Sequence, residues 1–136
     1  MTSTLDATNT IAWASLDEAI SALRTHVARH PALPLANVSV RAGGSGHGRV
    51  EVCMPSTDQP TSCAALLVWL DTLTSASLIL HHCDDNPQAH AYAELADGTP
   101  IMAIAPLDPT LLHGITGDRS GDRVLHWLRW QATETY

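Results

Sequence analysis

The sequence contains no phenylalanine and no lysine, and each absence limits what the chain can do. Without phenylalanine, four tryptophans must supply most of the large aromatic volume, and each can bury roughly 150–250 Å²; they are Trp13, Trp69, Trp127 and Trp130. Without lysine, all seven basic residues are arginines, and fourteen acids give a formal net charge of −7. Because an acidic chain repels phosphates, we expect no nucleic-acid binding.

Long apolar runs and paired cysteines are also missing. No stretch approaches the roughly 18 uninterrupted apolar residues of a membrane span, and the first residues have neither the basic start nor the apolar centre of a signal peptide. The three cysteines, Cys53, Cys63 and Cys83, are odd in number and lack C-x-x-C spacing, which argues against a disulfide framework. We therefore expect a cytoplasmic protein with free thiols and no membrane contact.

Two segments resemble functional motifs without meeting their requirements. The glycine-rich segment 43–48 lacks the Lys-Ser/Thr ending of a phosphate-binding loop, and Arg49 occupies the place of the last glycine in a dinucleotide fingerprint. His26 and His30 have the spacing of a helical metal pair, but Val27 replaces the glutamate of the H-E-x-x-H protease motif. The sequence therefore predicts no cofactor, unless zinc binds at the site described below.

Composition favours one folded domain, because 45 % of the 136 residues are apolar and only 15 % are charged. Residues 1–12 are small, polar and without periodicity, which predicts a mobile N-terminal tail followed by a single domain over 13–133. The capping box of Ser15 and Glu18 predicts that a helix begins at Leu16 and ends before Pro31.

The rest of the chain alternates between strand and helix patterns. We expect strands at 37–42 and 49–54 joined by the glycine loop, a buried helix within 56–73, strands at 77–84, 89–96 and 99–105, and a helix at 122–132. This order predicts an α+β two-layer sandwich. Its antiparallel sheet has about five strands, a two-strand hairpin plus a three-strand meander, with the helices on one face.

The meander contains a candidate metal site. A tight connection through residues 84–88 pairs Cys83 with Ala89 and His82 with His90, and the Asp97-Gly98 pair predicts a two-residue hairpin loop. On this register one face is the core; it carries Ile79, His81, Cys83, Ala89, Ala91, Ala93, Leu95, Met102 and Ile104. The opposite face is half polar; it carries Leu78, Leu80, His82, His90, Tyr92, Glu94, Ile101 and Ala103.

A transition metal needs three or four ligands at about 2.0–2.3 Å. His82 and His90, completed by Asp84 or Glu94, offer the right residue types for zinc. The alternative interpretation, which we favour, is a solvated strand end that leads into an acidic turn.

The last helix contains a candidate contact surface. Arg123, His126 and Trp130 fall on its expected outer side, and arginine and tryptophan are common anchors of protein interfaces. This pattern favours contact with a protein partner or a second subunit. The competing interpretation places Trp127 in the core and leaves Trp130 half covered.

These observations lead to two hypotheses. The first is a small, acidic, non-catalytic protein-binding or regulatory module that self-associates as a homodimer. The alternative is a small metal-binding protein or metal-dependent hydrolase that uses the His82 and His90 face. Eight histidines would raise the formal charge by eight units if all were protonated, so we expect association or solubility to change between about pH 7 and 5.

Overall fold

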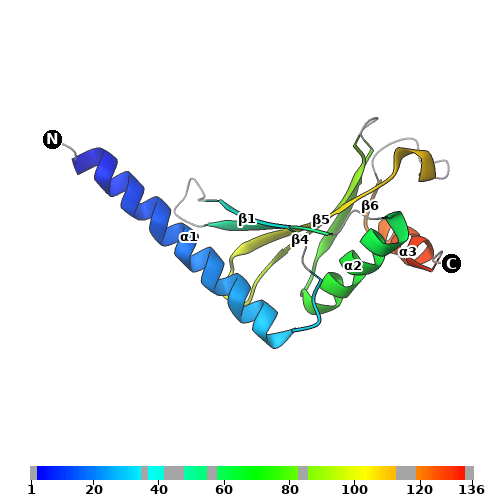
Figure 1. Cartoon of the computed structure of the whole chain (residues 1–136), viewed down its shortest axis with the longest axis horizontal. Coiled ribbons are helices and arrows are strands. Elements are labelled where there is room, and N and C mark those ends of the chain that lie inside the picture. Colours follow the sequence, from blue (N-terminus) through cyan, green and yellow to red (C-terminus); the bar gives the residue numbers. More distant parts are fainter. Residues whose placement is uncertain are drawn as a thin grey trace.

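The computed structural model describes residues 3–34, 37–41, 48–54, 58–82, 86–112 and 119–133, with the backbone alone for 3–12. In these ranges three helices pack on one face of a β-sheet: α1 (Ser3–Arg29), α2 (Gln59–Thr72) and α3 (Asp122–Ala132). α1 lies at one end of the long axis, and α2 and α3 lie at the other (Figure 1). The predicted α+β class is confirmed.

The sheet has six described strands in the order β1-β2-β5-β4-β3-β6. They are β1 (Asn37–Arg41), β2 (Arg49–Cys53), β3 (Ser77–His81), β4 (Gln88–Glu94), β5 (Pro100–Pro106) and β6 (Arg119–Ser120). The predicted β1–β2 hairpin and the antiparallel meander β3-β4-β5 are confirmed, although residues 42–47 of the glycine loop lie outside the described ranges.

Two features of the sheet differ from the prediction. The short strand β6 pairs with the outer edge of β3, so the sheet has six strands rather than about five. β2 and β5 pair in parallel, with Val50 opposite Ile101, so the sheet is mixed rather than wholly antiparallel. This pairing joins segments about fifty residues apart and therefore leaves no local sequence signal.

Helix α1 begins earlier than predicted, at Ser3 rather than Leu16. Residues 3–14 contain no proline or glycine, so nothing interrupts the backbone hydrogen bonds before the capping box. Ser15, the expected cap, lies inside the helix and is buried. The division into a mobile tail of residues 1–12 and a single domain over 13–133 stays a prediction.

Gly48 lets α1 approach the start of β2. A Cβ atom added to this glycine would lie 2.9 Å from the Ala19 Cβ and even closer to the Ser15 carbonyl oxygen. Only glycine avoids this overlap without a shift of the helix. The close contact therefore fixes α1 against the hairpin.

Helix α2 is the central helix of the core. Asp58 caps it by accepting a hydrogen bond from the Thr61 N–H at 2.7 Å, and its buried side chains include Leu66 and Trp69. The Trp69 indole N–H donates to the Pro34 carbonyl at 2.7 Å, which holds the connector between α1 and β1. After β5 the chain forms the short 3-10 helix η1 (Pro109–Leu111).

The registers of the meander differ from the prediction at both hairpins. The β4–β5 loop has three residues, 96–98, because the Leu95 N–H donates to the Thr99 carbonyl at 2.9 Å and Gly98 adopts φ +90°. On the other side of β4, Leu80 rather than Cys83 lies opposite Ala89. The β3–β4 register differs from the predicted one by three residues and the β4–β5 register by one. A register shift by an odd number of residues moves the side chains of a strand to the opposite face of the sheet.

The faces of β3 and β5 are therefore reversed relative to the prediction, whereas the buried Ala89 and Ala91 of β4 are as expected. The covered face carries Val50, Val52, Leu78, Leu80, Ala89, Ala91, Ile101, Ala103 and Ala105. The half-buried residues of the open face include Ile79, His81, Met102 and Ile104, which the sequence placed in the core. Cys83 lies outside the described residues.

Candidate functional site

The open face of the sheet contains a pair of histidines, but not the predicted pair. His90 lies opposite Ile79 instead of His82, and its ring centroid is 4.5 Å from that of His81. Its Nδ1 lies 3.0 Å from the Tyr92 hydroxyl and its Nε2 lies 2.8 Å from Gln88 Oε1. Burial lowers the pKa of His90, the nearby His81 lowers it further, and Glu51 acts in the opposite direction.

Among the described residues, this geometry does not gather three of the predicted zinc ligands. His82 lies one residue beyond the end of β3, outside the β3–β4 ladder that contains His90. Glu94 lies four residues from His90 on the same strand, a separation of about 13 Å, and Asp84 lies outside the described residues. Within the described ranges, no group of three or more His, Cys, Asp or Glu side chains is placed to hold a metal ion. The zinc site stays a prediction.

The predicted contact surface on α3 is exposed. Arg123, His126 and Trp130 lie on the outer side of the helix, and 49 % of the Trp130 surface is accessible. Val124 and Leu128 are buried on the opposite side. Trp127 is half buried and packs against the core, and contact with a partner through Arg123, His126 and Trp130 stays a prediction.

A buried pair of amides holds α3 in place. Gln59 Nε2 donates to Gln131 Oε1 at 2.7 Å and to the Leu111 carbonyl at 3.1 Å, while Gln59 Oε1 accepts from the Asp108 N–H at 2.7 Å. Gln131 directly follows Trp130, so the exposed tryptophan stands on a fixed turn of the helix. Because these hydrogen bonds fix α3, we expect the surface around Trp130 to be ordered before a partner binds.

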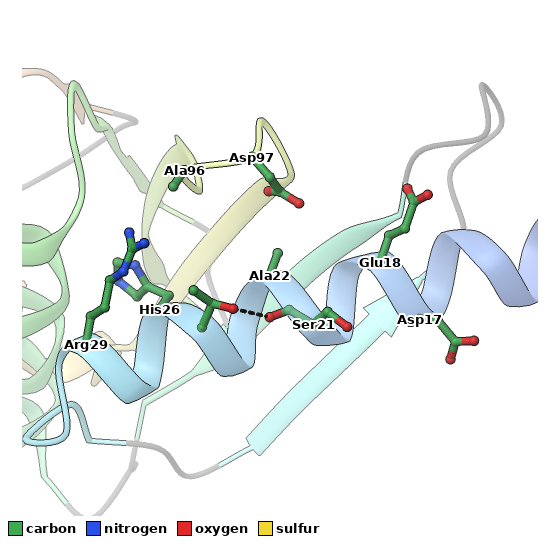
Figure 2. A pocket seen from close by; sticks show the side chains of 9 residues that line it. Asp17, Glu18, Ser21, Ala22, His26, Arg29, Ala96 and Asp97 are labelled. Carbon is green, nitrogen blue, oxygen red and sulfur yellow. Dashed lines mark hydrogen bonds between the residues drawn. The ribbon is translucent and has the colours of Figure 1, made fainter.

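Sequence reasoning missed a groove of about 560 Å³ between α1 and the tip of the β4–β5 hairpin. Figure 2 shows Ala96 and Asp97 of the hairpin facing α1, which carries most of the lining. The lining residues are Asp17, Glu18, Ser21, Ala22, Thr25, His26, Arg29, Ala96 and Asp97. The hairpin and α1 are about seventy residues apart in sequence, so no local pattern could have indicated that they meet.

Comparison of the chain with protein-family models, with curated proteins and with solved structures finds no match. Among the helices of the described ranges, none combines the length and the apolar character that a bilayer crossing requires.

Proposed function

We propose that this protein is a small, acidic, non-catalytic module that binds another protein through α3 and also self-associates. The observation that supports this function is the exposed position of Arg123, His126 and Trp130 on one side of a helix whose other side is buried. An exposed indole beside an arginine has the composition of an interface anchor.

The charges near this surface indicate the chemistry of the partner. Arg119, Arg123 and Arg129 are exposed in the described segment 119–133, where Asp122 is the one acidic residue, although the whole chain has a formal charge of −7. An acidic protein segment would be repelled by most of the molecule and attracted here, which would orient it before contact. We therefore propose a partner segment with carboxylates around an apolar side chain that packs on Trp130.

Selection from a random peptide library on the immobilised protein tests this function. We expect the enriched peptides to combine acidic and apolar residues, and their affinity can be measured by fluorescence anisotropy. Trp130→Ala and Arg123→Glu should each weaken binding at least about tenfold, or ~1.4 kcal/mol. Arg24→Glu, an equal charge reversal at an exposed position of α1, is the matched control and should bind like the wild type.

Two results would overturn the proposal. One is enrichment of peptides without acidic residues. The other is a set of acidic peptides that bind both α3 variants as tightly as the wild type.

A further inference from the structure

The outer edge of the sheet at β1 is open. β1 pairs with β2 on one side, and no described strand pairs with its other side. Val38 points to the covered face of the sheet, yet 38 % of its surface is accessible, whereas its cross-strand neighbour Val52 is fully buried. Among the described residues, the core is therefore uncovered where the sheet ends, and no described strand takes up the outer backbone groups of β1.

Helix α1, which covers this part of the sheet, also has apolar side chains along one flank. α1 contacts both β1 and β2, and Ala19 and Leu23 face the sheet. Glu18, Ala22 and His26 line the groove toward the β4–β5 hairpin (Figure 2). Figure 2 shows the β4–β5 hairpin above α1 and the start of β1 below it, so the flank of α1 opposite the groove faces the β1 edge.

That flank carries Trp13, Leu16 and Ile20 at helical spacing. The accessible fraction of Trp13 is 67 %, and Leu16 and Ile20 are only partly buried and lie outside the core cluster. Both layers of the sandwich therefore end in apolar side chains on the same side of the molecule. We name the surface formed by Trp13, Leu16, Ile20 and Val38 the β1 edge surface.

We propose that the β1 edge surface binds a second copy of this chain, with β1 pairing antiparallel to β1 of the partner subunit. The two sheets then continue into one another across a two-fold axis. This inference rests on the self-association proposed above and names its surface, which is separate from α3.

The sequence of β1 is complementary to itself in this arrangement. With the two-fold axis at Ser39, Val38 lies opposite Val40 of the partner subunit, so apolar side chains meet on the covered face. Asn37 lies opposite Arg41 of the partner subunit, so no like charges are paired. Arg41 also has its own carboxylate partner, since its Nη2 lies 3.4 Å from Glu51 Oε2.

The same two-fold axis brings the helices together. Because α1 contacts both β1 and β2, each copy of the helix would lie beside the new β1–β1 pair, on the same face of the joined sheet. The two helices would run antiparallel and face each other with the flank of Trp13, Leu16 and Ile20. The same two-fold axis would therefore cover both the β1 edge of the sheet and the apolar flank of α1.

Sedimentation velocity over a range of concentrations tests this proposal with matched variants. The wild type should dimerise, and Val38→Arg and Trp13→Glu should each raise the dimer dissociation constant at least about tenfold. Val68→Arg is the control for Val38→Arg, because Val68 on α2 is 40 % accessible and lies away from the β1 edge surface. Trp130→Ala should also leave the dimer intact. Circular dichroism confirms that each variant is folded, and Trp13→Glu, at the most exposed position, keeps the test decisive if Val38→Arg does not fold.

The possible failures can be told apart. A monomeric wild type would overturn self-association and this inference together, but would leave binding through α3 untouched. A dimer that survives both Val38→Arg and Trp13→Glu would overturn this inference alone. If Trp130→Ala then dissociated it, the dimer contact would lie on α3 instead.

Discussion

His26 and Thr72 join the end of α1 to the end of α2, with His26 Nε2 at 2.9 Å from the Thr72 hydroxyl oxygen. The Thr72 hydroxyl donates its hydrogen to the Trp69 carbonyl at 2.8 Å, so it accepts from His26, and Nε2 carries the proton. The His26 ring also stacks on Trp69, with ring centroids 5.8 Å apart. The buried Trp69 of α2 therefore helps to hold His26, and with it the C-terminal part of α1, in place.

This contact makes stability depend on pH. Burial, followed by His30 and Arg29, lowers the pKa of His26 below its ordinary value of about 6.5. The unfolded chain then binds a proton that folded His26 does not, so the free energy of unfolding should decrease as pH falls below about 6.5. The lowered pKa of His90 has the same sign.

Urea unfolding at a series of pH values measures this dependence. We expect His26→Gln to have a smaller loss of stability below pH 6.5 than the wild type. A stability that increases on acidification through this range, or equal slopes for the two proteins, would contradict the assignment.

Gly48→Ala should destabilise the fold by about 1–3 kcal/mol, because the added methyl group would overlap the Ser15 carbonyl and the Ala19 side chain. Thermal or urea unfolding gives the difference. Ser21→Ala, at an exposed position of α1, is the control and should change the free energy of unfolding by no more than about 0.5 kcal/mol. An unchanged midpoint for Gly48→Ala would show that α1 does not pack closely on the start of β2.

Cys63 should be inert to thiol reagents in the native protein. It is fully buried, and burial raises its pKa to about 12, so almost no thiolate is present at neutral pH. Cys53 is only half buried and should react first, although burial raises its pKa as well. Peptide mapping after alkylation, with and without urea, distinguishes the two. Equal native labelling at both positions would be inconsistent with the buried site of Cys63.

Zinc uptake provides a test of the alternative function. Both ring nitrogens of His90 are already within hydrogen-bond distance of Tyr92 and Gln88. We therefore expect the wild type and His90→Ala to take up the same amount of zinc in a dialysis assay. One zinc ion per subunit that is lost in both His82→Ala and His90→Ala would instead support the metal hypothesis.

The elements predicted correctly are those specified by neighbouring residues. The alternating valines of β1 and β2, the Asp58 cap of α2 and the amphipathic pattern of α3 each lie within a short window of sequence. The β4–β5 register was wrong because Asp97-Gly98 suits loops of two or three residues, and only the packing of β5 against β2 and β4 selects between them.

The two proposed surfaces also differ in how far the sequence could predict them. The α3 surface was predictable, because the helical period determines which of its side chains face outward. The β1 edge surface was not, because it combines Trp13 and Ile20 of α1 with Val38 of a strand about twenty residues later. His90 was assigned to the wrong partner because a shift of three residues places Ile79 opposite it.

The most direct test of the central claim is native mass spectrometry of the tag-free protein over a micromolar to submillimolar concentration range. The proposed binding module should show twice the subunit mass, with a dimer fraction that increases with concentration. A spectrum that contains only the monomer at every concentration would contradict self-association.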